Sequence, residues 1–131
     1  MAGTLTISTL SDGTNSTSST NCIKGSAKAW VNYNTIAQTI ISSFNVSSVT
    51  YVSTGTFTVN FTTAFSDANY IPVATSIAYN TGESGFVVTV AGDYSTGPAL
   101  KTASACRFET GLSRATSLTS TIGTYIAFFG S

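Results

Sequence analysis

The stretch TGTFTVNFTTAFSDANY, residues 54–70, decides the expected fold of this chain. Phe57, Val59 and Phe61 recur at every second position, and uncharged polar side chains occupy the positions between them. A period of two is typical of a strand that covers a core with one face only. The other face of this strand is expected to carry Thr56, Thr58, Asn60 and Thr62.

The segments on either side of this strand extend the pattern. Residues 46–52 are strand-like, and the turn at Gly55 joins them to the quoted stretch as an antiparallel hairpin. In the segment FSDANY, Asp67 and Asn69 predict a corner, because their short side chains bond neighbouring backbone groups. Pro72 near the start of the following strand predicts that this strand lies at a sheet edge.

The rest of the body also favours strands. Residues 36–44 have a partly helical spacing of isoleucines, but their β-branched residues and serines favour a bent strand. Roughly seven to nine short strands with frequent turns predict an all-β fold, a single β-sandwich or jelly-roll-like domain without a helix. Further strands are expected within 27–32, 71–79, 86–90, 106–109 and 125–129, and loops at 80–85, 91–104 and 111–123.

The N-terminal residues differ from the body. Thr4 to Leu10 alternates like a short strand, with Leu5 and Ile7 on one side, and residues 11–21 contain no apolar residue. We therefore expect an N-terminal arm and polar linker over residues 1–24 and the β-sandwich domain over residues 25–131. Such an arm either docks on a neighbouring subunit or packs back on its own domain.

Composition limits the possible partners. Only 8% of the 131 residues are charged, the net charge is zero, and Ser and Thr occupy 44 positions. Lys24 and Lys28 are too few to form the basic patch that nucleic acid or an anionic membrane needs. No apolar run approaches the ~20 residues of a membrane span, and the start does not resemble a secretory signal. A net charge near zero gives no electrostatic repulsion between copies, so it suits a protein that works in an assembly.

The sequence offers little for catalysis. It contains no histidine, which is the commonest general base and metal ligand. Asp12, Asp67, Glu83 and Asp93 fall in expected turns, and Glu109 is the fifth carboxylate. No phosphate-binding or calcium-binding motif occurs. We therefore expect no enzyme activity, no catalytic, cofactor-binding or metal-binding residue, and no cofactor.

Three kinds of residue remain as candidates for other roles. Tyr94 could stack on a sugar ring or simply pack its loop down, and Trp30 is expected to be a core or interface anchor. Cys22 and Cys106 could form a disulfide, but two buried free thiols are the simpler expectation. Asn-x-Ser/Thr triplets at Asn15, Asn45 and Asn60 are expected by chance in a chain so rich in Ser and Thr.

A family resemblance rests on four segments: LSDGTNS (10–16), GSAKAWVNYN (25–34), SFNVSSVT (43–50) and TGTFTVNFTTAFSDANYIPVATS (54–76). Together they resemble a module of virion proteins of tailed bacteriophages, often described as tail-fibre or tail-associated proteins, especially in phages of cyanobacteria and marine bacteria. The resemblance covers residues 10–76 and is only general from residue 77 onward.

The resemblance implies an all-β, trimeric, non-enzymatic protein on the virion surface, made in the bacterial host cytoplasm, and it transfers no binding residues. Its implied partners are other copies, other virion proteins and host cell-surface polysaccharide, without nucleic acid or membrane insertion. A fibre-like module for host attachment and a capsid decoration protein or head fibre that latches through its arm are both open. An unrelated secreted carbohydrate-binding domain is a third possibility.

Overall fold

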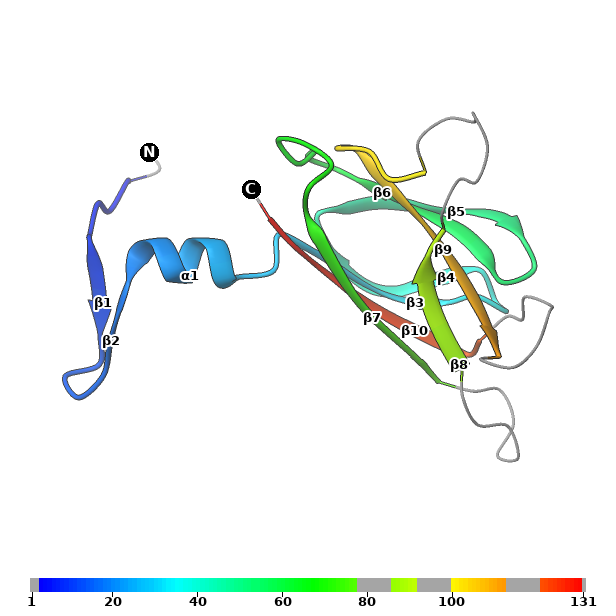
Figure 1. Cartoon of the computed structure of the whole chain (residues 1–131), viewed down its shortest axis with the longest axis horizontal. Helices are drawn as coiled ribbons and strands as arrows, with labels where there is room; N and C mark the ends of the chain where they lie inside the picture. Colours follow the sequence, from blue (N-terminus) through cyan, green and yellow to red (C-terminus); the bar gives the residue numbers. More distant parts are fainter. Residues whose placement is uncertain (1–2, 78–85, 92–99, 113–120, 131) are drawn as a thin grey trace.

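The computed structural model describes residues 3–77, 86–91, 100–112 and 121–130, and these residues form one helix and ten strands (Figure 1). The first three elements are β1 (Thr9–Ser11), β2 (Ser16–Ser18) and α1 (Ser19–Gly25). The others are β3 (Ala29–Asn34), β4 (Thr39–Phe44), β5 (Val46–Ser53), β6 (Thr56–Phe61), β7 (Ile71–Ile77), β8 (Phe86–Val90), β9 (Ala105–Leu112) and β10 (Gly123–Phe129).

The body consists of two antiparallel sheets that pack face to face. One sheet has the strand order β4-β3-β10-β7 and the other has the order β5-β6-β9-β8. Each sheet turns one set of alternate side chains toward the other sheet, as the period of two requires. The predicted all-β sandwich is therefore confirmed.

The opening stretch forms the hairpin and corner that its pattern predicts. β5 and β6 pair antiparallel, with Val49 opposite Val59. At the following corner, the backbone N–H of Asn69 donates to the Asp67 carboxylate at 2.7 Å. Pro72 lies in β7, which is an edge strand of its sheet, as predicted.

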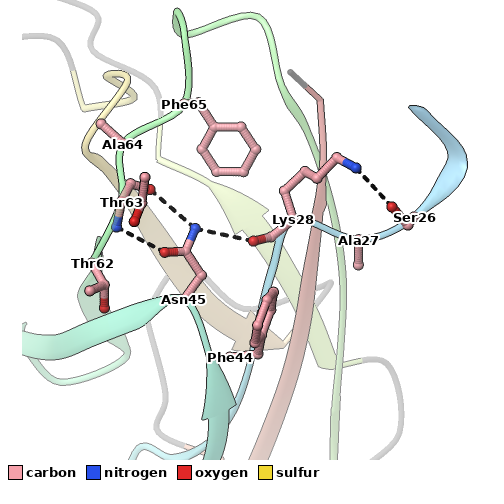
Figure 2. A pocket seen from close by; sticks show the side chains of 9 residues that line it. All are labelled: Ser26, Ala27, Lys28, Phe44, Asn45, Thr62, Thr63, Ala64 and Phe65. Carbon is pink, nitrogen blue, oxygen red and sulfur yellow. Dashed lines mark hydrogen bonds between the residues drawn. The ribbon is translucent and has the colours of Figure 1, made fainter. Parts of the chain in front are cut away.

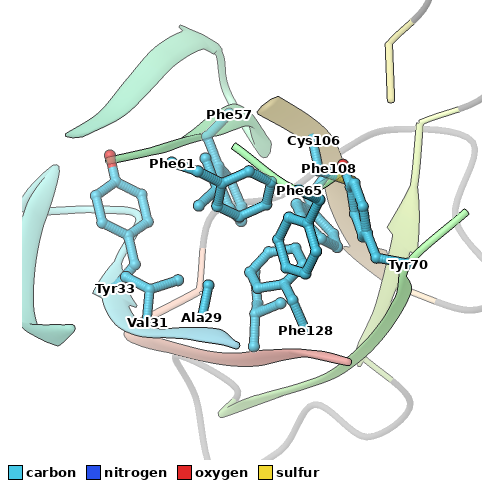
Figure 3. Packing of buried hydrophobic residues seen from close by; sticks show 12 residues of the cluster. Ala29, Val31, Tyr33, Phe57, Phe61, Phe65, Tyr70, Cys106, Phe108 and Phe128 are labelled. Carbon is cyan, nitrogen blue, oxygen red and sulfur yellow. The ribbon is translucent and has the colours of Figure 1, made fainter. Parts of the chain in front are cut away.

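The core lies between the two sheets and is rich in aromatic rings (Figure 3). Phe61 of β6 is central, because its ring meets Phe128 of β10 edge-on at 4.8 Å and Phe65 at 4.9 Å between ring centroids. Edge-to-face contacts of this kind add to the free energy gained by burying the rings. The buried cluster consists of Ala29, Val31, Tyr33, Phe57, Val59, Phe61, Phe65, Tyr70, Cys106, Phe108, Ile126 and Phe128.

Tyr70 ties the corner after β6 to the segment before β9. Its hydroxyl donates to the carbonyl oxygens of Thr102 and Ala105, at 2.8 and 3.0 Å. Burial raises the pKa of this phenol well above its ordinary value, so the group stays a neutral donor. Gly130 lies so close to Tyr70 that an added Cβ would come within 2.8 Å of the tyrosine Cβ, so a larger residue requires a local shift.

The N-terminal arm, defined here as residues 3–25, stands apart from the sandwich (Figure 1). Packing of the arm on its own domain, one of the two expectations, is wrong, because no residue of α1 is buried and Leu5 remains 81% exposed. The expectation of a fold without a helix is also wrong, because the polar linker contains β2 and α1. Ser18 caps the helix by accepting the N–H of Asn21, and residues 9–18 pair as a hairpin.

Several expected boundaries shift. Residues 35–38 form a turn that ends with Gln38 at a φ of 55°, so the strand expected from residue 36 begins at Thr39. The strand expected at 4–10 is confined to Thr9–Ser11, and β9 is longer than the four residues expected. The predicted loop 80–85 and most of the predicted loops 91–104 and 111–123 lie outside the described residues.

Candidate interaction surfaces

A groove of about 700 Å³ opens where the arm joins the sandwich (Figure 2). Asn45 lies at its centre, as the single residue between β4 in one sheet and β5 in the other. Its φ of 54° turns the chain sharply, and asparagine tolerates this left-handed conformation better than most residues. The groove is lined by Ser26, Ala27, Lys28, Phe44, Asn45, Thr62, Thr63, Ala64 and Phe65.

The side chain of Asn45 is fully engaged in joining three segments. Its Nδ2 donates to the carbonyl oxygens of Lys28 and Thr63, both at 3.1 Å, and its Oδ1 accepts the N–H of Thr63 at 2.8 Å. Lys28 turns its ammonium toward the arm, where it donates to the carbonyl of Ile23 and to the hydroxyl of Ser26. The polar groups of this groove therefore hold the arm, the β4–β5 corner and the residues after β6 together.

The outer face of the β4-β3-β10-β7 sheet has a different character. Most of its large outward side chains are apolar and exposed, although Asn32, Ser42 and Thr75 lie among them as polar residues, and no residue of these four strands is charged. Soluble monomers rarely expose contiguous apolar patches of this kind unless they bind something. We call this surface the apolar face and define it by Trp30, Phe44, Ile71, Val73, Ile77, Tyr125, Ala127 and Phe129.

A shallow hollow of about 480 Å³ lies in the middle of the apolar face. Ala127 of β10 lies directly between Trp30 of β3 and Val73 of β7, because it is the register partner of both. A small residue between two large ones leaves a gap about two strand spacings, or ~10 Å, wide. Tyr125 also lines this gap, and at its level a row of polar side chains, Ser42, Asn32 and Thr75, crosses the sheet. The hollow is therefore bounded by aromatic and aliphatic groups on one side and by polar groups on the other.

The structure refines the expectation for Trp30. Ala29 and Val31 are buried beneath the sheet, whereas the indole of Trp30 points outward and is 40% exposed. Trp30 therefore belongs to a surface and not to the core. Tyr94, the other aromatic candidate, lies outside the described residues.

The three carboxylates among the described residues serve separate parts of the molecule. Asp12 caps its turn by accepting the backbone N–H groups of Asn15 and Thr14, and these bonds lower the pKa of its carboxyl. Glu109 lies on the outer face of the other sheet, and Asp67 serves the corner described above. Glu83 and Asp93 lie outside the described residues. Within the part of the chain that the structure describes, no three Cys, Asp or Glu residues gather as a metal site.

The expectation of two buried thiols is half wrong. Both cysteines are free; Cys106 is buried in the core, but Cys22 is exposed on α1. The polar composition of α1 gives it no face to bury, which is why its cysteine stays at the surface. Burial raises the pKa of the Cys106 thiol to about 11.

Asn45 and the apolar face were both missed as sites from the sequence. A lone asparagine gives no signal of its hydrogen bonds, and its place in an Asn-x-Ser triplet points to other chemistry. The apolar face carries a faint signal, since Ile71, Val73 and Ile77 alternate with partly buried residues along one strand. A pattern with apolar residues on both faces of an edge strand indicates that something covers the outer one.

No protein-family model, curated protein or solved structure matches this chain. Within the described residues, no helix has the length and apolar character needed to cross a membrane.

Proposed function

We propose that this chain is a non-enzymatic structural protein of a bacteriophage particle, a fibre-like module on the particle surface that takes part in attachment to the host. The observation that carries the proposal is the pairing of an arm that extends away from the sandwich with a large, uncharged and mainly apolar face on one small domain. Both features are unfavourable in an isolated monomer and useful in a multi-subunit particle.

The resemblance to tailed-phage virion modules supports the same proposal. Its quoted segments within residues 25–76 supply β3, β6, most of β5 and β7 and the Asn45 junction, but only the end of β4. A charge-poor surface of hydroxyls and amides also suits a fibre-like protein. Host polysaccharide is the ligand class of this proposal, because hydroxyls and aromatic rings are the groups that contact sugars.

The test is to locate the protein and to block its role. Antibodies raised against the purified chain should label a defined structure in electron micrographs of the phage that encodes it. The purified chain should also bind susceptible cells and compete with infection. Particles without label would overturn the proposal, and a chain that neither binds cells nor slows infection would remove its attachment role.

A second candidate is a capsid decoration protein or head fibre that latches onto the shell through its arm. The position of the arm, clear of its own sandwich, is the specific observation that favours this candidate. Label on the head, together with failure of the double variant Leu5→Asp/Ile7→Asp to join the particle, would select it. The variant Thr6→Asp, on the other side of the same segment, is the matched control.

A further inference from the structure

We propose that the apolar face of each copy is covered by the N-terminal arm of a second copy, with Leu5 and Ile7 of the arm lying in the hollow above Ala127. The proposal deepens the assembly part of the proposed function by assigning both contact surfaces. It concerns contacts between purified copies, so it can fail while the placement on a phage particle still holds.

The first step of the argument is that each copy carries two complementary surfaces without a partner. Leu5, Ile7 and Leu10 of the arm are exposed, and so are the large side chains of the apolar face. The segment 3–10 contains no charged residue, and neither do the four strands of the face. Removing both from water therefore leaves no unpaired charge, which is the main penalty for burying a surface.

The second step is that an arm does not reach its own apolar face in this structure. The seven residues of α1, at ~1.5 Å per residue, hold the β1–β2 hairpin about 10 Å beyond the start of the sandwich. The hairpin is fixed to the helix, because Ser8 accepts the backbone N–H of Ser19 at 2.9 Å. Leu5 and Ile7 are thus exposed on an arm that lies clear of its own domain, where another copy can reach them.

The third step compares sizes. Four strands at ~4.8 Å spacing and about seven residues in length give the apolar face an area of roughly 400 Å². A stable interface buries about 800 Å² on each partner, so two such faces packed on each other supply only half of that. When the two copies exchange arms, each copy buries both its face and its arm, so two arm–face contacts take the place of one face–face contact. Residues 3–10 can span up to ~26 Å, which is enough to cross the sheet.

The fourth step concerns shape. The hollow lies between Trp30 and Val73 because Ala127 is small, and it accepts aliphatic side chains from above. Leu5 and Ile7 lie two residues apart and therefore about 7 Å apart on one side of an extended chain. That separation fits within the ~10 Å gap, whereas a second flat sheet would leave the hollow empty.

The experiment is a complementation between two full-length variants. The arm variant Leu5→Asp/Ile7→Asp keeps an intact face, and the face variant Val73→Asp keeps an intact arm. Val73 is 58% exposed on an edge strand, so its substitution spares the core. Thr6→Asp and Thr50→Asp are the matched controls, placed on the opposite side of the arm and on the outer face of the other sheet. Circular dichroism and thermal melting check that each variant is folded.

Light scattering and sedimentation then measure self-association. We expect the unaltered chain and both controls to associate, and each variant alone to associate about a hundredfold more weakly. A mixture of the two variants should form mixed complexes, since the arm of one still fits the face of the other. An unaltered chain that stays monomeric, a disruption by only one of the two variants, or a mixture that does not associate would each overturn the proposal.

Discussion

The two outer faces of the sandwich are built on the same scaffold but interact differently with water. On the β5-β6-β9-β8 sheet, the outward polar side chains bond one another: Asn60 donates to the hydroxyls of Ser48 and Thr50, both at 3.0 Å, and Arg107 donates to Thr58 at 3.3 Å. We call this surface the polar face. The apolar face of the other sheet has mainly rings and aliphatic chains at its outward positions, apart from a row of polar residues at Ser42, Asn32 and Thr75.

This difference assigns separate tasks to the two sheets. The threonine-rich strand β6 contributes to the polar face, where outward side chains bond one another within one copy. Such a surface gains little free energy by contacting a partner. The apolar face gains free energy from any cover that removes it from water. The hydroxyl-rich composition therefore maintains solubility, and association depends on the less conspicuous sheet.

The largest expected effect on stability comes from comparing a residue on the inner side of β10 with its neighbour on the apolar face. Phe128 and Phe129 are neighbours in β10, but Phe128 is fully buried between the sheets and Phe129 lies half-buried on the outer side. Phe128→Ala should lower the free energy of unfolding by about 3–5 kcal/mol, because it leaves a cavity among Phe61, Tyr70 and Phe108. Phe129→Ala should cost about 1 kcal/mol.

Urea unfolding of dilute protein, at concentrations where it is monomeric, measures both variants. Equal losses for the two phenylalanines would show that the outer side is also part of a core, and the contrast between the two faces would then be wrong.

The next effect concerns the junction through which the chain passes from one sheet to the other. Asn45→Ala removes the side-chain bonds to Lys28 and Thr63 and places a less suitable residue at a φ of 54°. We expect a loss of about 2–4 kcal/mol in the free energy of unfolding. Asn45→Gly should recover about 1 kcal/mol of it, because glycine removes the backbone strain but not the loss of hydrogen bonds.

Thermal melting of the two variants side by side separates the two contributions. If Asn45→Ala unfolds like the unaltered chain, the groove is not a structural junction, and its polar groups become candidates for ligand binding.

A smaller effect compares one asparagine from each outer face. Asn60 on the polar face donates two hydrogen bonds, so Asn60→Ala should cost about 1–2 kcal/mol. Asn32 lies beside the hollow of the apolar face, and its buried Oδ1 has no hydrogen-bond partner among the described residues. Asn32→Val should therefore leave stability unchanged or raise it slightly, because valine also suits a central strand. Chemical denaturation that ranks these two variants in the opposite order would contradict the contrast between the faces.

The features that the sequence could predict are those that depend on neighbouring residues. Alternation in residues 56–61 is local, so the hairpin, its inward face and the Asp67 corner follow from it directly. Pro72 predicts an edge strand for the same kind of reason, since the missing N–H limits its place in any sheet.

The missed features depend on contacts between distant residues. The apolar face joins Trp30, Val73 and Ala127, which only the strand order β3-β10-β7 places side by side. Asn45 acquires its role from Lys28 and Thr63, each about seventeen residues away in sequence. The helix α1 was missed because its seven residues are too polar to show a periodic pattern, and a cap at Ser18 is a weak signal in a serine-rich segment.

The smallest effect on stability at neutral pH is expected from the two thiols. Cys106 of β9 lies in the core beneath the polar face, whereas Cys22 lies on the surface of the arm. In the native protein at pH 8, a thiol reagent should modify Cys22 readily and leave Cys106 intact, because burial keeps the Cys106 thiol protonated. Modification of Cys22 should not change the unfolding midpoint. The second thiol should react only in denaturant, and two equally fast native reactions would show that the core beneath the polar face opens.

The same buried thiol makes the free energy of unfolding depend on pH. The pKa of Cys106 rises from 9.0 to about 11 on folding, so its contribution to stability is complete below pH 9 and is lost as the pH rises toward 11. The raised phenol pKa values of Tyr33 and Tyr70 act in the same direction at still higher pH. Cys106→Ala should therefore lose less stability than the unaltered chain between pH 9 and pH 11, measured by urea unfolding at each pH. Equal slopes for the two proteins would mean that the thiol titrates alike in the folded and unfolded chains, and that Cys106 is in contact with water.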